Sequence, residues 1–452
     1  MALQIFEPQN RIKLYIIGGV AGLVVLILMI VLLLNSFGAI QPAGKVTLQF
    51  WGVFDPPSYY IDAISAYQKL NPNISIIYQQ FNYDDYERRL LNSFAAGTGP
   101  DIWLMHNTWL PKHGDKIEPM PQPGLGITGK NLKNPILTLN DFTKQFVEVA
   151  VDDLTLNGQI YALPLYVDTL ALYYNRDIFN SAGIINPPAT WDEFNEDIIK
   201  LTSLDQQGRI LRAGAAMGTA KNINRSTDIL SLLMLQSGVQ MTDKDHTFAT
   251  FSGSADSQSL GKVALQYYTD FANPSKQVFT WNDQQNYSID AFVAGNTAMV
   301  LNYSHQTLDI RNKAPRFNFS VAPVPQINNS QTAVNFANYW APTVSKQSKN
   351  ALEAWKFLNY LSSADGVRPY INASSRPAAR RELIGLQQND PDLGVFATQA
   401  LSARSWFQVD NNAIETIFAN MIDDVNYSRA SVHDALQTAE SKINVLMQKN
   451  SR

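Results

Sequence analysis

Residues 161–179 read YALPLYVDTLALYYNRDIF, a long run that is apolar on both faces and carries one internal acid, Asp168. A run of this kind is typical of a strand that is buried on both faces of its sheet. An unpaired carboxylate in such a place costs several kcal/mol or gives up its charge, so it needs hydroxyl groups, a cation or a basic partner. We therefore expect Asp168 to contact a bound ligand or, alternatively, backbone N–H groups or a basic residue such as Arg376.

The segment before this run alternates between strand and helix patterns. Strand-like residues at 46–51, 74–78 and 101–105 are separated by two stretches with helical spacing, and Ser58 is the expected cap of the first helix. The order βαβαβ predicts a parallel sheet whose ligand-binding loops follow the carboxyl ends of its strands. Those loops are residues 52–55 and 106–109.

The chain after residue 150 carries further signals. Asn157-Gly158 lies between two short apolar runs and predicts a two-residue hairpin turn. Thr190 and Glu193 have the spacing of a capping box at the start of a helix. The other expected elements are strands at 297–302 and 317–324, a loop at 325–338, and helices at 351–361 and 432–446.

The N-terminal region contains an uncharged segment of 21 residues, 14–34. As a helix it is about 31 Å long, which matches the roughly 30 Å hydrocarbon core of a bilayer. Arg11 and Lys13 precede it and the next basic residue is Lys45, so we expect a single-pass anchor in the cell membrane with residues 1–13 in the cytoplasm and the rest extracellular or periplasmic. A cleaved signal peptide is the alternative, although its apolar run usually has only about 7–15 residues.

Length and composition limit the classes of protein. A chain of 452 residues exceeds what one hydrophobic core usually organises, so two lobes are expected. The net charge of −4 leaves no basic stripe, so nucleic acid is not an expected partner. The chain has no cysteine, so neither a disulfide framework nor a lipidated cysteine is available.

Motifs for catalysis or metal binding are missing from the sequence. It contains no G-x-S-x-G, no H-E-x-x-H and no P-loop, and its five histidines lack the spacing of metal ligands. Adjacent acids such as Asp152-Asp153 point apart rather than forming a catalytic pair. We therefore expect neither a catalytic residue nor a metal site.

Four separated stretches carry a family resemblance: LQFWG at 48–52, GTGPDIWLM at 97–105, residues 158–194 with YYNRDIF and PPATWDEF, and AGNTAMVLNYS at 294–304. Together they resemble the family 1 extracellular solute-binding proteins of ATP-binding cassette (ABC) importers, the group that includes maltose-binding protein. The resemblance implies a two-lobed α/β venus-flytrap fold of the periplasmic-binding-protein type (type II). It also implies a small-molecule solute, most simply a sugar or oligosaccharide, a partner ABC permease, no cofactor and no enzymatic activity.

The expected division of the chain follows from this resemblance. The run at 161–179 passes from one lobe to the other, and the segment around Trp340 is the suspected second crossing. The expected parts are a cytoplasmic N-terminus at 1–13, an anchor at 14–34, a linker at 35–44, a first lobe of 45–165 plus 317–365, and a second lobe of 170–316 plus 370–449.

Candidate ligand-binding residues combine aromatic faces, which stack on sugar rings, with polar groups that hold hydroxyls. Trp51, Trp109 and Trp340 are chosen because each lies at the end of a strand or at a suspected crossing. Tyr303 and Trp406 hold positions where the family resemblance implies a stacking aromatic. The polar candidates are Asp55, Asn107, Asp168, Asn302 and Arg376.

Two other functions use the same observations. One is a membrane-tethered exported glycan hydrolase, which would show turnover. The other is a sensor or adhesin on the same scaffold, which would bind a ligand without serving a permease.

Overall fold

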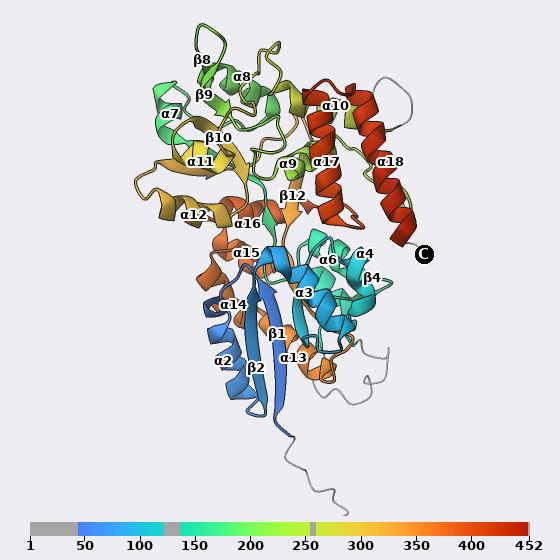
Figure 1. The fold of residues 1–452 in the computed structure, drawn as a ribbon. Coiled ribbons are helices and arrows are strands. Elements are labelled where there is room, and N and C mark those ends of the chain that lie inside the picture. Colours follow the sequence, from blue (N-terminus) through green and yellow to red (C-terminus); the bar gives the residue numbers. More distant parts are fainter. Residues whose placement is uncertain (1–43, 122–135, 254–258, 451–452) are drawn as a thin grey trace, which may run out of the picture.

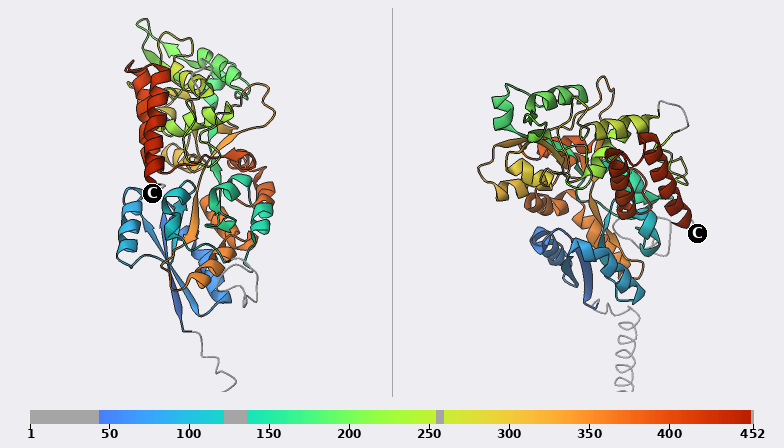
Figure 2. Two further views of the ribbon diagram at one scale, coloured as in Figure 1. Left: turned by 90° about the vertical axis from the view of Figure 1, so that its right-hand side faces the viewer. Right: turned by 45° about the horizontal axis from the view of Figure 1, so that its top comes forward.

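The computed structural model describes residues 44–121, 136–253 and 259–450, and its helices and strands form two lobes (Figure 1). The lobes stay distinct when the molecule is turned (Figure 2). Each lobe has its own hydrophobic core, with Trp103 and Trp355 fully buried in the first lobe and Tyr268 and Trp281 in the second. Two separate cores are what a chain of this length needs to bury its apolar residues.

Four strands form the sheet of the first lobe, in the order β13-β3-β1-β2. β1 (Val46–Val53) pairs in parallel with β2 (Ile74–Phe81) and with β3 (Ile102–His106). β13 (Trp340–Val344) adds to β3 in the antiparallel direction. The predicted βαβαβ order is therefore confirmed, and β3 ends at His106, which reaches Asn338 of the neighbouring crossing segment.

Five strands form the sheet of the second lobe, in the order β11-β7-β10-β9-β8. β10 runs parallel to β9 and antiparallel to β7, and β11 completes the edge beside β7. The bounds are β7 Ala171–Asn175, β8 Ser203–Leu204, β9 Ile210–Ala215, β10 Thr297–Asn302 and β11 Phe319–Ala322.

A small third sheet joins the lobes. It consists of β6 (Asp168–Thr169), β12 (Asn335–Asn338) and β14 (Ala403–Arg404), in the order β14-β12-β6. Each strand connects a segment of one lobe to a segment of the other, so the chain crosses three times between the lobes. We name these three strands the hinge sheet.

Helices cover the sheets of both lobes (Figure 1). Those that pack on the first lobe are η1 Pro57–Tyr59, α2 Ile61–Leu70, α3 Tyr83–Ala95, α4 Leu110–His113, η2 Gly114–Lys116, α5 Leu139–Gln145, α6 Glu148–Leu154, α13 Ala351–Leu361, α14 Ala364–Ser374 and α15 Arg381–Gln387. Those of the second lobe are α7 Arg176–Ser181, α8 Trp191–Leu201, α9 Ser226–Gln236, α10 Leu260–Asp270, α11 Ser288–Val293, α12 His305–Lys313, α17 Asn411–Asn426 and α18 Val432–Asn450. α16 (Gly394–Ala400) lies at the hinge sheet, and a two-stranded hairpin, β4 (Thr155–Leu156) with β5 (Gln159–Ile160), extends the first lobe.

Several local predictions are confirmed. The hairpin turn has positive φ angles at Asn157 (51°) and Gly158 (75°), as a primed two-residue turn requires. Thr190 caps α8 by accepting a hydrogen bond from the Glu193 backbone N–H at 3.2 Å. The predicted strand at 297–302 is β10.

Other local predictions are wrong. Ser58 does not cap a helix, because Pro57 begins a short 3-10 turn and α2 starts only at Ile61. The run at 161–179 is not one strand, since it contains β6, β7 and the helix α7. The expected loop at 325–338 contains β12, whose Asn335 donates from Nδ2 to Ser402 Oγ at 2.8 Å within the hinge. That partner allows a polar side chain to sit inside a buried strand.

The lobe boundaries differ from the expected ones. β11, expected in the first lobe as part of 317–365, pairs with β7 of the second lobe. Tyr370 and Ala379, expected in the second lobe as part of 370–449, are buried in the core of the first. The reason is that the second and third crossings occur at β12 and β14. Within the described residues no helix is long and apolar enough to cross a bilayer, and the expected anchor at 14–34 lies outside them.

Candidate functional site

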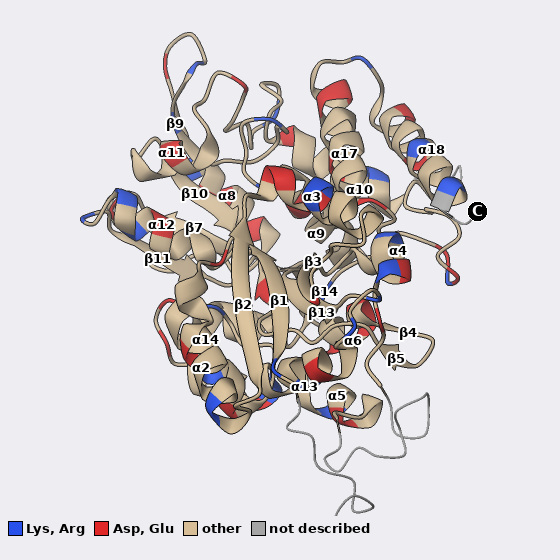
Figure 3. Cartoon of the chain, turned by 60° about the horizontal axis from the view of Figure 1, so that its bottom comes forward, with Lys and Arg blue, Asp and Glu red and all other residues tan. Residues whose placement is uncertain are grey.

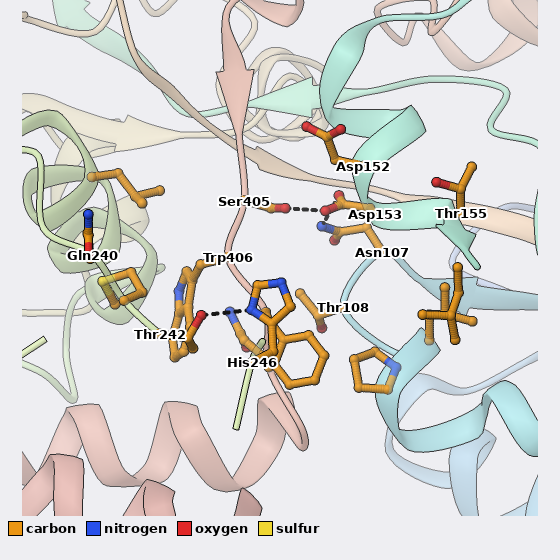
Figure 4. Close-up of a pocket in the computed structure, with 17 residues that line it drawn as sticks. Asn107, Thr108, Asp152, Asp153, Thr155, Gln240, Thr242, His246, Ser405 and Trp406 are labelled. Carbon is orange, nitrogen blue, oxygen red and sulfur yellow. Dashed lines mark hydrogen bonds between the residues drawn. The ribbon is translucent and has the colours of Figure 1, made fainter. Parts of the chain in front are cut away.

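A cavity of about 690 Å³ lies between the lobes (Figure 4). Its first wall comes from the first lobe, at Asn107 after β3 and at Asp152 and Asp153 of α6. The opposite wall comes from the second lobe, and the chain after β14 contributes Trp406 to the cavity. Cavities of about 300–1,000 Å³ are typical of small-molecule sites. We name this space the interlobe cavity.

A second, much smaller space of about 20 Å³ lies next to it and shares Thr108, Trp406 and Gln408 with it. This inner space is lined by His106 of the first lobe and by Asp228 and Glu415 of the second, among others. The two spaces therefore have part of their walls in common.

Aromatic rings of the first lobe gather beside the inner space around Trp340, which is 7% exposed. The ring centroids of Trp109, His106 and Phe54 lie 4.9, 5.3 and 5.9 Å from that of Trp340. Tyr83 stacks on Phe54 at 5.1 Å and is 39% exposed, so the edge of this aromatic cluster is accessible. An exposed edge of aromatic faces is a suitable surface for a sugar ring.

Charged groups of the second lobe lie on the other side of the inner space. Asp228 accepts a hydrogen bond from the Tyr303 hydroxyl at 2.7 Å, and the Arg225 guanidinium lies 5.6 Å from the Tyr303 ring centroid. Burial raises the pKa of Asp228, and burial together with the charge of Asp228 raises the pKa of Glu415. Burial also lowers the pKa of His106 to about 4, so this imidazole is neutral at pH 7. Together, the side chains around the inner space can offer both hydrogen-bond donors and acceptors to the hydroxyls of a ligand.

Asp168 lies in the hinge sheet, where neighbouring protein groups hold its carboxylate. Its carboxylate accepts hydrogen bonds from the backbone N–H groups of Thr169 (2.9 Å) and Ser304 (3.0 Å) and from the Ser304 hydroxyl (2.7 Å). Burial raises the pKa of Asp168 to about 6, although these donors oppose the shift. Asp168 therefore joins the second lobe to the hinge. These hydrogen bonds explain why the apolar run at 161–179 can contain a buried carboxylate.

Asp55 and Arg376 also form a contact with each other. The Arg376 Nη2 atom lies 2.7 Å from Asp55 Oδ1, and the guanidinium lies 4.2 Å from the Tyr166 ring centroid. Asp55 accepts further hydrogen bonds from the hydroxyls of Tyr60 (3.1 Å) and Tyr370 (2.7 Å). This buried ion pair holds the loop after β1 against the segment after α14.

The remaining polar candidates differ in position. Asn107 donates from Nδ2 to Asp153 Oδ2 at 2.9 Å on the wall of the interlobe cavity. Asn302 is fully buried and donates from Nδ2 to Asn224 Oδ1 at 3.0 Å. Trp51 packs on Phe81 at 4.6 Å, and neither Trp51 nor Asn302 lines either space.

Direct contacts between the lobes form what we name the clasp. Trp109 Nε1 donates to Asn411 Oδ1 at 2.8 Å. Lys112 of α4 lies 2.9 Å from Asp410, the N-cap of α17, and 2.7 Å from Glu87 of α3. The clasp and the aromatic cluster share Trp109, so the same side chain takes part in the contact between the lobes and in the wall of the site.

Of the ten predicted residues, Asn107 and Trp406 line the interlobe cavity. Trp109, Tyr303 and Trp340 contact residues that line the inner space, namely Asn411, Asp228 and His106. The structure adds residues that the sequence did not single out: Phe54, Tyr83, His106, Asp153, Arg225, Asp228, Asn338, Asn411 and Glu415. Phe54 and His106 fall inside the predicted loops 52–55 and 106–109. Arg225 has a left-handed backbone (φ 65°), which no sequence motif announces.

Charges elsewhere are interspersed over both lobes in the view of Figure 3. Among the described residues no group of three or more His, Asp or Glu side chains is placed to hold a metal ion. The site itself offers aromatic rings for stacking and polar side chains from both lobes for hydrogen bonding.

Comparisons with known proteins agree with this geometry. Residues 62–393 match the family described as bacterial extracellular solute-binding protein. A Brucella abortus (strain 2308) protein that carries the name of a binding protein is 24% identical over 396 residues, which cover 86% of this chain and 90% of that one. The maltodextrin-binding protein of Bacillus subtilis (strain 168) is 25% identical, with 73% of each chain covered.

The structure of the sugar-binding protein MalE from Xanthomonas citri has the same fold. It superposes with a TM-score of 0.72 at 21% identity, covering 90% of this chain and 98% of that one. The match to the family spans well over half of the chain, and the described residues form the two-lobed architecture expected from the sequence. This chain belongs to the bacterial extracellular solute-binding proteins.

Proposed function

We propose that this protein binds a sugar or oligosaccharide between its lobes. The observation that carries the proposal is the meeting of the aromatic cluster of the first lobe with the polar groups of the second, beside a cavity of ligand size. Aromatic faces stack on the C–H side of a pyranose ring, and amides and carboxylates bind its hydroxyls. The names of the Bacillus subtilis and Xanthomonas citri proteins support the same class of solute.

Site roles follow from the contacts. Trp340, Trp109 and Trp406 act as stacking or wall residues, and Tyr303 and Asn107 position polar groups at the site. Asp168, Asp55, Arg376, Asn302 and Trp51 hold the hinge and the loops through their contacts with neighbouring side chains and backbone groups. Ligand that contacts both lobes stabilises the closed state through its higher affinity for that state.

Delivery to an ABC permease completes the proposed function. Residues 14–34 act as an uncleaved membrane anchor, because the segment has the length of a bilayer span and the chain has no cysteine for a lipid anchor. The binding lobes then lie outside the cytoplasmic membrane, where they meet the permease.

A thermal-shift screen of neutral sugars on the full-length chain in detergent tests the proposal. A sugar at 100 times its Kd should stabilise the fold by about 2.7 kcal/mol. Tyr83→Ala should abolish most of that stabilisation and leave the melting temperature of the free protein nearly unchanged, because Tyr83 is 39% exposed. Incubation with the bound sugar should yield no hydrolysis product.

Tyr427→Ala is the matched control, since Tyr427 is 44% exposed and lies after α17, outside the residues that line the site. It should keep the full sugar-dependent shift. A screen in which no mono- or oligosaccharide shifts the melting temperature contradicts the proposed function, and equal shifts in the two variants contradict the assignment of the aromatic cluster.

A further inference from the structure

The loop after β1 contains a strained backbone. Phe54, the first residue beyond the strand, has a left-handed φ angle of 65°. The Asp55 backbone N–H donates to the Val53 carbonyl oxygen at 2.7 Å across it, so the three residues form a γ-turn with a positive central φ, which is a rare and strained turn. A left-handed backbone brings Cβ close to a backbone carbonyl oxygen, which is costly for a residue with a large side chain. The free protein therefore loses stability at this turn.

The other non-glycine residues of the described chain that have a positive φ are of two kinds. Arg225 also has a large side chain, with a φ angle of 65°, and its guanidinium lies 5.6 Å from the Tyr303 ring centroid in the second lobe. The remainder have smaller side chains and are Asn157, His246, Asn329, Ser375 and Ser428. The two large side chains on a left-handed backbone thus lie in opposite lobes, near the place where these meet. Strain of this kind clusters at active sites and ligand clamps.

Neighbouring groups of the first lobe hold this turn in place. Asp55 is 2% exposed, and its carboxylate accepts a hydrogen bond from the Tyr370 hydroxyl at 2.7 Å beside the ion pair described above. The Tyr78 hydroxyl donates to the Asp55 carbonyl oxygen at 2.8 Å. Gln80 Nε2 donates to the Phe54 carbonyl oxygen at 3.1 Å. Both residues of the turn are therefore fixed from several sides, which is the condition under which a strained backbone persists. The buried side chains at its centre, here named the turn anchor, are Asp55, Tyr60, Tyr370 and Arg376.

The ring that the turn presents stays accessible. Phe54 is 49% exposed, although it stacks on Tyr83 at 5.1 Å with an interplanar angle of 22°. The Tyr83 hydroxyl donates to Asn412 Oδ1 of α17 at 3.4 Å, so the ring pair lies where α17 approaches the first lobe. Burial of the Phe54 ring in the free protein thus does not account for the strain. A nearly parallel pair of exposed aromatic rings is a suitable face for the C–H side of a sugar ring.

We propose that Phe54 is a sugar-contacting residue whose ring is positioned by the turn anchor. The proposal rests on the proposed function, since it names the side chain on which the same sugar stacks. A sugar bound on the ring removes apolar surface of Phe54 from water, and this gain offsets the strain of the turn. The buried side chains of the turn anchor act through the ring that they hold, so they are positioning residues.

Two variants at Phe54 separate the effect of the ring from that of the turn. Asn adopts a left-handed backbone more readily than Phe, so Phe54→Asn removes the ring and relieves the strain. The full-length chain is titrated calorimetrically with maltotriose, mannobiose and cellobiose, and each of these sugars that binds the wild type should bind Phe54→Asn about tenfold more weakly. The melting temperature of this variant without sugar should stay within about 3 °C of the wild type. Phe54→Tyr keeps the ring and should bind with wild-type affinity.

A double-mutant cycle tests the positioning role. Tyr370→Phe removes only the hydroxyl that donates to Asp55 and keeps the buried ring. In the wild-type background it should weaken sugar binding about fivefold, as expected for one lost hydrogen bond. In the Phe54→Asn background it should change the affinity by less than about twofold, because the ring that it positions is absent. Tyr267→Phe is the matched control, since it removes a hydroxyl that donates to Asn195 at 2.8 Å within the second lobe, and it should keep the affinity.

Equal affinities of Phe54→Asn and the wild type would overturn the proposal and leave sugar binding intact. A loss of affinity that Phe54→Tyr shares, together with a fall in melting temperature, would also overturn it, because the residue would then have only a structural role. An equal effect of Tyr370→Phe in both backgrounds would overturn positioning by the turn anchor. If neither these three sugars nor any other sugar in the thermal screen binds the wild type, the proposed function fails as well, so the failures are distinguishable.

Discussion

At the scale of single residues, Asp168 shows how the fold keeps a charge inside an apolar run. The side chain is 2% exposed, and two backbone N–H groups and one hydroxyl donate to it. These donors join the hinge strand β6 to the residues that follow β10. The carboxylate therefore has a structural role in this arrangement. Its burial lowers the free energy of unfolding when the group is ionised.

The variant Asp168→Asn tests this loss of stability through the pH dependence of the free energy of unfolding. Burial raises the pKa of Asp168 to about 6 from an ordinary 3.8, so the folded state binds more protons than the unfolded state between these values. Wild-type stability contributed by this group is therefore present at pH 4 and lost as the pH rises through 6. Relative to wild type, the variant should gain up to about 3 kcal/mol between pH 4 and pH 7 in urea unfolding.

The comparison with wild type at each pH removes the contributions of all other groups. Asp62→Asn, which changes the net charge equally at an exposed position, is the control for that change. If the free energies of unfolding of Asp168→Asn and wild type differ by the same amount from pH 4 to pH 7, burial does not raise the pKa of Asp168.

The sequence identified some site residues because local signals place them. Trp109 and Asn107 follow a strand that the pattern predicts, and Trp340 lies at a predicted crossing. Arg225, Asp228 and Glu415 gave no signal, because single charged residues at the starts of helices usually lie on the surface. Their positions beside Tyr303 and the inner space depend on tertiary contacts that the local sequence pattern does not contain.

At the scale of elements, the clasp between α3, α4 and α17 decides how the lobes meet. Lys112 lies between Glu87 of its own lobe and Asp410 of the other, with 23% of its side chain exposed. Partly buried charge pairs of this kind are screened less by salt than exposed ones. The clasp therefore stabilises the contact between the two lobes.

Lys112→Met should weaken sugar binding by about fivefold, or about 1 kcal/mol, because closure then lacks the ion pair with Asp410. The free protein should also show a larger radius of gyration in small-angle X-ray scattering. Lys116→Met is the control, since Lys116 pairs with Asp115 within the first lobe. Identical affinities and radii in the two variants would rule out a role for the clasp in closure.

Elements were predictable wherever one local rule sufficed. The Asn157-Gly158 turn has the backbone angles that only a few residue types adopt readily, and β10 is bounded by clear signals. The hinge strands β6, β12 and β14 have only two to four residues each, and their pairing partners are far apart in the chain. Their existence depends on tertiary contacts, so the sequence pattern did not show β12.

At the scale of the whole molecule, the chain forms two cores joined by three crossings. The two-lobed architecture was predictable from length and from the resemblance, whereas the boundaries were not. The predicted bounds changed lobe near residues 317 and 370, although the suspected second crossing was at Trp340. They therefore placed β11 in the first lobe, and the end of α14 and all of α15 in the second. The actual crossings lie at β12 and β14.

Closure around a carbohydrate is the central claim, and the chain is convenient for testing it because it has no native cysteine. Asp84→Cys on α3 and Thr416→Cys on α17 place two labels at exposed positions of opposite lobes. Tyr83 and Asn412, their close neighbours in sequence, are joined by a hydrogen bond of 3.4 Å.

The decisive measurement is single-molecule energy transfer between these labels on the full-length chain, with and without a saturating sugar chosen by the thermal screen. The account predicts a population at longer distance in the free protein that collapses to one short-distance population with sugar. An unchanged distance distribution with a sugar that calorimetry shows to be bound would contradict it.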